Sequence, residues 1–379
     1  MNMYCEVFVA ENHLMYCICV GYGKKGQWQE AENVVDRMKA KGVKPNSQSF
    51  SFLLEAYSLS GQIPKGELLI SKMKDGNLIS GTPGYNAFLR FYCRAGDIGS
   101  AFQTYEMLRT SGPKLNQSSF VPMIEALTQE GAVDERFWGI IQDIENAPFE
   151  AKYVIHSALL STLARCGPTQ DGMRVLKTLE LLGCPQDVLI LFKSGAVSQG
   201  AANTEDDIWK RMTGLFNSIE REGTNLEAER NFHNALIDAL WSFQYEMRAL
   251  KLTELSVTLG VFGSNVCEWQ GDGWALDLRH TGVGASQVLL LTWLAGIRED
   301  IKSGGKMSSK IRILLAWEWQ LRTGENWAAR DAMAARLKEL KAPFVLVKDG
   351  QQLEVNASTL RKWLLREITA RRLVFNSRV

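Results

Sequence analysis

The chain is 379 residues long, which exceeds the size of one ordinary hydrophobic core, so we expect two or more domains or an array of repeats. With 46% hydrophobic and 22% charged residues, a wholly disordered chain is excluded, and no stretch approaches the roughly 18 uninterrupted apolar residues of a membrane span. The seven cysteines form no CxxC pair, and none of the four histidines lies at metal-ligand spacing from a cysteine. Neither a disulfide scaffold nor a zinc site is therefore expected.

The net charge of +1 hides an uneven distribution. Residues 274–379 contain 18 Lys and Arg against 10 Asp and Glu, whereas residues 1–273 contain 25 against 32. A polyanion would therefore be attracted first to the C-terminal part of the chain. A drift of surface charge without functional meaning is the alternative interpretation.

Several residue types recur at a fixed interval in the N-terminal half. Four glycines, Gly26, Gly61, Gly96 and Gly131, are spaced 35 residues apart, and Gly167 follows after 36. Aromatic and aliphatic positions repeat in the same register, as in Tyr22, Tyr57 and Tyr92, in Phe50, Tyr85 and Phe120, and in Leu54, Leu89 and Ile124. A period of this length predicts an array of repeats, each a supersecondary unit.

Each unit has the pattern of two helices. Tyr85, Phe88, Leu89 and Tyr92 form one apolar face of a first helix, and Gly96 is expected to end that helix in the left-handed conformation. A second helix is predicted over 98–109. Small residues recur near the start of each second helix, at Ala31, Gly66 and Ala101, where the two helices of a hairpin would approach closely. One hairpin cannot cover its own apolar face, so the units are expected to stack into an α-helical solenoid.

The segments Tyr85–Leu89 (Tyr-Asn-Ala-Phe-Leu), Tyr92–Gly96 (Tyr-Cys-Arg-Ala-Gly) and Gly42–Asn46 (Gly-Val-Lys-Pro-Asn) resemble pentatricopeptide repeats. The 34-residue tetratricopeptide repeat has a different aromatic pattern. In this register the solenoid covers residues 1–264, with units at 12–46, 47–81, 82–116, 117–152 and 153–186 and a degenerate part at 205–264. Phe232–Ile237 resembles the opening of a further unit.

The resemblance implies binding of single-stranded RNA at one base per repeat. In this family the fifth residue of a unit contacts the base edge, helped by the last residue. The pairs are Tyr16 with Asn46, Ser51 with Gly81, Asn86 with Asn116, Val121 with Lys152, and Ser157 with Gln186. The predicted RNA-binding residues are Tyr16, Asn46, Ser51, Asn86, Asn116 and Ser157. By resemblance, Asn86 with Asn116 prefers a pyrimidine, whereas the Val121 side chain makes no hydrogen bond to a base.

A small α/β domain is predicted over 274–368, followed by a basic tail over 369–379. Strands are expected at 274–278, 310–317, 344–348 and 353–355, and helices at 285–301, 327–340 and 358–368, the last capped by Asn356 or Ser358. Asp349-Gly350 is a hairpin signal between the last two strands.

This domain resembles the small MutS-related (SMR) domain. Leu276–Arg279 (Leu-Asp-Leu-Arg) matches the first motif of that family, but Ala316–Trp319 (Ala-Trp-Glu-Trp) occupies the place of its second motif, threonine-glycine-any-glycine. A literal Thr-Gly-Val-Gly occurs instead at Thr281–Gly284, between the first strand and its helix, and we interpret it as turn chemistry. Nucleolytic members of the family imply Asp277 and Arg279 as catalytic residues, and Glu318 is a candidate second carboxylate.

Repeats followed by such a domain resemble the plastid branch of these proteins, which implies a chloroplast protein of RNA processing, transcript stabilisation or translation, with plastid transcription or translation machinery as candidate partners. Met1–Glu11 is too short for a transit peptide, so we expect the true N-terminus to be missing. The first hypothesis is an RNA-binding protein with a non-cleaving SMR domain and no cofactor. The alternatives are an SMR-dependent RNA endonuclease, for which a divalent metal is conceivable, and a protein-binding helical scaffold.

Overall fold

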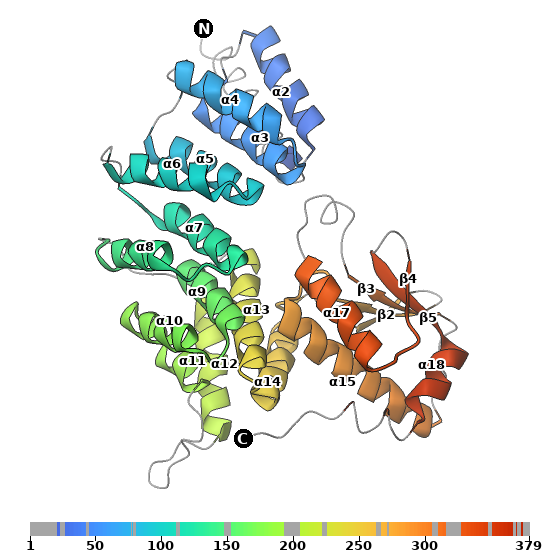
Figure 1. Cartoon of the computed structure of the whole chain (residues 1–379). Coiled ribbons are helices and arrows are strands. Elements are labelled where there is room, and N and C mark those ends of the chain that lie inside the picture. Colours follow the sequence, from blue (N-terminus) through green and yellow to red (C-terminus); the bar gives the residue numbers. More distant parts are fainter. Residues whose placement is uncertain are drawn as a thin grey trace. The chain divides into compact units, whose positions relative to one another are not determined.

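The structure is a computed structural model of the whole chain (Figure 1). It describes residues 21–22, 27–42, 45–76, 78, 81–110, 114–147, 153–192, 205–221, 226–262, 267–270, 273–304, 310–315, 327–347, 351–366, 369 and 373. The chain forms two compact units, residues 1–149 and 150–379. The predicted boundary between repeats and α/β domain, between residues 264 and 274, falls inside the second unit.

The first unit consists of helical hairpins in which the first helices of successive hairpins pack on one another. Helix α3 contacts α5, and α5 contacts α7, while each first helix also contacts its own second helix (Figure 1). The helices are α2 (Trp28–Ala40), α3 (Ser47–Leu59), α4 (Ile63–Asp75), α5 (Gly81–Ala95), α6 (Ile98–Thr110), α7 (Gln117–Glu130) and α8 (Glu135–Glu145).

Glycines end the first helices where the period predicted them. Gly61, Gly96 and Gly131 all have φ between 68° and 75°, the left-handed region that suits glycine. The predicted close approach of helices is also present, since a Cβ added to Gly66 in α4 would overlap the ring of Phe91 in α5. Ala31 and Ala101, at the equivalent place, are fully buried.

The second unit begins with further hairpins. Helix α13 packs along α9, and the ring of Tyr153 on α9 lies 5.5 Å from that of Phe232 on α13. Helix α14 pairs with α13 as its second helix. The helices are α9 (Tyr153–Cys166), α10 (Gln170–Leu181), α11 (Gln186–Ile190), α12 (Glu205–Arg221), α13 (Leu226–Ser242) and α14 (Glu246–Thr258). Gly167, which follows α9, also has a positive φ, of 60°.

A five-stranded sheet with the order β1-β2-β3-β5-β4 completes the second unit. Strands β2 and β3 are parallel and are connected through helix α15, while the other neighbouring pairs are antiparallel. The elements are β1 (Cys267–Gln270), β2 (Gly273–Asp277), α15 (Val283–Lys302), β3 (Lys310–Leu314), α17 (Trp327–Glu339), β4 (Val345–Val347), β5 (Gln352–Asn356) and α18 (Ala357–Leu364).

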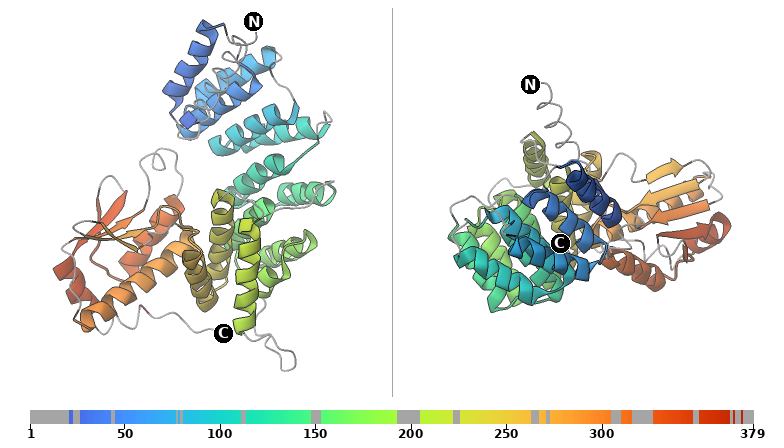
Figure 2. Two further views of the ribbon diagram at one scale, coloured as in Figure 1. Left: turned by 180° about the vertical axis from the view of Figure 1, so that it is seen from behind. Right: turned by 90° about the horizontal axis from the view of Figure 1, so that it is seen from above.

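The helices of this domain lie on one side of the sheet (Figure 2). The strand residues that face them alternate along each strand, as Leu276, Ile311 and Ile313 do, and are buried. Asn356 caps α18 through its side chain, one of the two caps that the sequence predicted. Stacked helical hairpins followed by a small α/β domain confirm the predicted fold class. Strand β1 was not predicted.

Candidate nucleic-acid interface

Among the described residues, the predicted base-contacting residues at the fifth position, Ser51, Asn86 and Ser157, lie on the first helix of their hairpins. The fifth and ninth residues of a unit are four apart, so they share one side of that helix. We call this surface of the first unit the inner face, and it comprises Ser51 and Glu55 on α3, Asn86, Arg90 and Arg94 on α5, and Val121 and Glu125 on α7. Glu125 and Arg94 are exposed, whereas Ser51, Glu55, Arg90 and Val121 are half-buried.

Asn46, the last residue of its unit, is the N-cap of α3. Its Oδ1 accepts the backbone N–H groups of Gln48 at 3.1 Å and Ser49 at 2.9 Å. This arrangement satisfies two of the unpaired donors in the first turn of α3. Because the amide oxygen is occupied, the exposed Asn46 side chain can offer a ligand only its Nδ2 donor group.

Asn116 occupies the same place two repeats later, at the N-cap of α7. Its Oδ1 accepts a hydrogen bond from Nδ2 of Asn86 at 3.1 Å and one from the Ser119 hydroxyl at 3.3 Å. The structure therefore brings together the predicted pair Asn86 and Asn116. Asn116 is exposed and retains its Nδ2 donor group, as Asn46 does.

Asn86 itself is only 3% exposed. Its Oδ1 accepts from the Ser119 hydroxyl at 2.7 Å, and its Nδ2 donates to Asn116. Both polar atoms of the amide are thus engaged with α7 and the turn before it. In this geometry Asn86 holds Asn116 in place, and a contact between Asn86 itself and a base stays a prediction.

The two predicted serines have restricted hydrogen-bonding capacity. The Ser51 hydroxyl donates to the Ser47 carbonyl at 2.8 Å, and the Ser157 hydroxyl donates to the Tyr153 carbonyl at 2.7 Å. Each serine can therefore offer a ligand only acceptor lone pairs. Ser51 is half-buried, whereas Ser157, on α9 of the second unit, is 8% exposed.

Some predicted residues lie outside the described ranges. These are Tyr16, the partner of Asn46, and Lys152, the partner of Val121. Val121 is half-buried on α7 and offers apolar surface only. Gly81 begins α5, and Gln186 begins α11 and is exposed.

The charged residues of the inner face partly neutralise one another. A guanidinium nitrogen of Arg94 lies 3.4 Å from a Glu55 carboxylate oxygen, joining α5 to α3. Such partly exposed pairs contribute little to stability, but they reduce the local positive charge. Glu55 and Arg94 were not predicted as part of the interface, although they lie four and eight residues after the fifth position of their units.

The two predicted catalytic residues of the α/β domain lie side by side at the end of β2. Arg279 donates to Asp277 through Nε at 2.9 Å, Nη2 at 2.5 Å and its backbone N–H at 3.1 Å. Burial opposes ionisation of Asp277, but these bonds from Arg279 prevail and lower the pKa of the carboxyl below its ordinary 3.8. A carboxylate held in this way is a weak proton acceptor.

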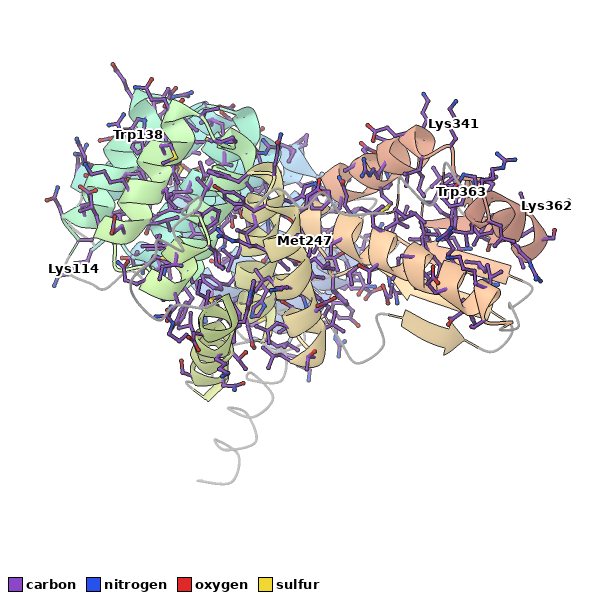
Figure 3. The ribbon with its side chains drawn as sticks, turned by 90° about the horizontal axis from the view of Figure 1, so that it is seen from below. Lys114, Trp138, Met247, Lys341, Lys362 and Trp363 are labelled. Atoms are coloured by element: carbon purple, nitrogen blue, oxygen red, sulfur yellow. The ribbon has the colours of Figure 1, made fainter. Side chains whose placement is uncertain are left out.

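Metal binding finds no support among the residues the structure describes, where no group of three or more His, Cys, Asp or Glu side chains is placed to hold an ion. Glu318 and the rest of Ala316–Trp319 lie outside the described residues. Lys341 and Lys362 extend from the α/β domain into solvent (Figure 3), in keeping with the basic composition of this part of the chain.

The segment Thr281–Gly284 forms the turn into α15, as the sequence predicted. Asp238 on α13 contacts this turn, and its carboxylate accepts three backbone N–H groups, from Val283, Gly284 and Ala285. Burial raises the pKa of Asp238 to about 6, although part of the residue's surface is exposed. The three N–H donors lower the pKa and only partly offset this effect. This contact was not predicted.

Comparison with known proteins agrees with the repeat pattern. Residues 12–59 match the PPR repeat family, and residues 69–179 match the family described as pentatricopeptide repeat-containing protein. These two segments are similar to pentatricopeptide repeats. Within the described ranges, no helix combines the length and apolarity needed to cross a bilayer.

The similar proteins carry the same repeats. A chloroplastic pentatricopeptide repeat-containing protein of Arabidopsis thaliana is 24% identical over 326 residues, which are 83% of this chain and 42% of that protein. Another chloroplastic one is 27% identical over 196 residues, 51% of this chain and 12% of its own length. Among solved structures, the pentatricopeptide repeat protein PPR10 from maize is 16% identical, with a TM-score of 0.37, and covers 86% of this chain and 48% of its own. The chain thus spans less than half the length of these proteins.

Proposed function

We propose that this chain binds single-stranded RNA through its pentatricopeptide repeats and acts in plastid gene expression, in transcript stabilisation, processing or translation. The observation that carries the proposal is the equivalent geometry of Asn46 and Asn116. Both cap the helix of the next repeat, both have an occupied Oδ1, and both are exposed with an Nδ2 donor to offer. Two such donors at equivalent places suit the reading of separate bases.

The chemistry of these asparagines supports a preference for bases with acceptors on their pairing edge. A donor-only amide can bond to O4 or O2 of uracil or to N3 or O2 of cytosine, and also to N1 of adenine or O6 of guanine. The pyrimidine preference for Asn86 with Asn116 is therefore what the resemblance implies, and the selection experiment below tests it. In single-stranded RNA these edges are accessible because the bases are unpaired.

The charge of the inner face supports modest overall affinity. Phosphate contacts supply much of the affinity for nucleic acids, and here Arg94 is paired with Glu55 while Glu125 lies on the next first helix. Base recognition would then contribute a large share of the binding free energy. The basic side chains of the α/β domain would add phosphate contacts.

The plastid role rests on names of similar proteins. Several curated relatives are named chloroplastic, and others mitochondrial. The α/β domain, which resembles an SMR domain, would bind RNA without cleaving it, because Asp277 is engaged by Arg279 rather than held as a free base or metal ligand. No observation favours the endonuclease or the protein scaffold over this proposal.

Selection from a random single-stranded RNA pool, followed by affinity measurement on the best ligand, tests the proposal. Asn116→Ala is expected to weaken binding by about 10-fold and to relax the preference at one nucleotide, on the scale of about 1–3 kcal/mol for a base contact. Asn86→Ala should produce the same loss at the same nucleotide, because it removes the partner that holds Asn116.

Asn146→Ala is the matched control, because Asn146 is an exposed asparagine at the end of α8, a second helix. Its affinity should equal that of the wild type. Absence of any selected sequence, or an equal loss from Asn116→Ala on every RNA, would contradict base reading. Asp277→Ala should leave labelled RNA uncut and bound as before, whereas cleavage that disappears with this substitution would establish the endonuclease.

A further inference from the structure

The hairpin α13–α14 repeats the local sequence of a pentatricopeptide unit. Asn234-Ala235 in α13 corresponds to Asn86-Ala87 in α5, so Asn234 and Asp238 stand where Asn86 and Arg90 stand. Helix α13 packs along α9 as α5 packs along α3, first helix against first helix. These two side chains therefore occupy the positions of the last hairpin that are equivalent to those of the inner face in the first unit.

Both side chains are bonded to the start of the α/β domain. Asn234 donates through Nδ2 to the His280 carbonyl at 3.0 Å and accepts the Gly282 N–H at 2.8 Å. The Asp238 carboxylate accepts the N–H groups of Val283 at 3.1 Å, Gly284 at 2.7 Å and Ala285 at 3.4 Å. Asp238 thereby supplies the acceptors that the first turn of α15 lacks within the helix and places a negative charge at the positive end of its dipole.

The approach between α13 and this turn requires glycine. A Cβ added to Gly284 would lie 2.9 Å from Cβ of Trp241 and 3.0 Å from Cα of Asp238, and one added to Gly282 would overlap the Asp238 carboxylate. The backbone of residues 282–285 thus lies directly on the side of α13 that carries Asn234 and Asp238. A nucleotide cannot occupy the same surface.

We infer that the last hairpin binds this chain's own α/β domain instead of RNA, and that the RNA segment read by the repeats ends before α13. The inference rests on the proposed function for its RNA part and on the contacts of Asn234 and Asp238 for its docking part. The Thr-Gly-Val-Gly sequence then has a definite role, because its two glycines and the backbone N–H groups of Gly282, Val283 and Gly284 form the surface to which α13 binds.

Hydrogen exchange of the full chain tests the docking part. Asp238→Ala should accelerate exchange at the amides of Val283, Gly284 and Ala285 by about 10-fold or more, as expected when about 1.4 kcal/mol of protection is lost. Peptides covering α17 should be accelerated less than those covering the start of α15. Asp134→Ala, which removes a comparable carboxylate cap from α8, should affect only the amides of that helix. Unchanged protection of α15 in Asp238→Ala would overturn the docking.

Selection from a random RNA pool tests the second part of the inference, that the RNA segment read by the repeats ends before α13. Asn116→Asp should change the preferred base at one position, whereas Asn234→Asp should change none. A new base preference in Asn234→Asp would overturn the inference, since it would show that this hairpin reads RNA. A wild-type chain that selects no sequence would contradict the proposed function and remove the RNA part, while the exchange experiment would still decide the docking.

Discussion

Two asparagines at the same place in their hairpins serve different partners. Asn86 on α5 bonds to Asn116 and Ser119, which belong to the next repeat, and so positions an exposed amide. Asn234 on α13 bonds to the backbone at His280 and Gly282, which belong to the α/β domain. The position within a repeat therefore fixes where the side chain lies, while the following element decides what it contacts.

The residues four positions later, Arg90 and Asp238, also differ in what they contact. Arg90 on α5 is half-buried on a face with both charges, whereas Asp238 on α13 meets the positive end of α15. A carboxylate suits a helix N-terminus, and a guanidinium there would be repelled. Glu55 and Glu125 are carboxylates at the same position on α3 and α7. The contact of Asp238 with α15, and not its charge alone, therefore marks the change from repeat–repeat contacts to contacts with another domain.

The largest expected effect comes from Asp238→Ala, which removes the contact of α13 with the start of α15. Three backbone N–H groups lose their acceptor, and we expect the free energy of unfolding of the second unit to fall by about 2–3 kcal/mol. Chemical denaturation measured by circular dichroism gives this value. Asp134→Ala, which removes an exposed cap, should cost about 1 kcal/mol, and equal losses would contradict an interdomain role for Asp238.

The pH dependence of stability gives the next largest effect. Because the pKa of Asp238 in the folded chain, about 6, lies above its ordinary 3.8, the folded chain binds more protons than the unfolded chain between about pH 4 and 6. This group therefore lowers the free energy of unfolding as the pH rises through that interval. We expect about 2 kcal/mol, less than the full shift implies, because the carboxylate is partly exposed.

His233 on the same helix acts in the opposite direction. Burial lowers its pKa to about 3, so the folded chain binds fewer protons than the unfolded chain below about pH 6.5, and stability is lost as the pH falls. The measurement is therefore the difference in unfolding free energy between the wild type and Asp238→Asn at several pH values. A difference that stays constant from pH 4 to 7 would exclude a titrating Asp238.

The hairpins could be predicted from the sequence because their determinants are local. The 35-residue period, the glycines with positive φ and the small residues such as Gly66 each act within one or two neighbouring helices. The strand β1 was missed because Cys267–Gln270 is short and gains its hydrogen bonds only by pairing with β2. Strand pairing depends on the partner more than on the segment itself.

The site was predicted less completely for a similar reason. The pairing of Asn86 with Asn116 was implied by the resemblance to pentatricopeptide repeats, but the burial of Asn86 and the bond from Ser119 depend on how α5 and α7 pack. Asp238 carries no local signal at all, because its role arises from residues 45 to 47 positions further along. Long-range contacts of this kind are what a single sequence does not reveal.

A smaller effect is expected from Gly284→Ala, which tests the close packing of α13 on the start of α15. The added Cβ would crowd Trp241 and the backbone of Asp238, and overpacking of this kind should destabilise the second unit by about 1–2 kcal/mol. Gly139→Ala in α8 is the matched control, because a Cβ there meets nothing within 4 Å. It should stabilise by about 0.5–1 kcal/mol through helix propensity. Thermal unfolding would show opposite signs, and equal signs would contradict close docking at Gly284.

The smallest expected effect concerns the inner face of the first unit. Glu55→Gln removes the carboxylate that pairs with Arg94, and the freed guanidinium becomes available to a phosphate. We expect RNA affinity to rise about threefold and the dependence of binding on salt to steepen by about one counterion, with little change in stability. Glu106→Gln, which removes a similar exposed partner from Arg109 on the second helix α6, should change neither quantity. If both substitutions raised affinity equally, the gain would reflect net charge, and Arg94 would make no specific phosphate contact beside the proposed base-contacting residues.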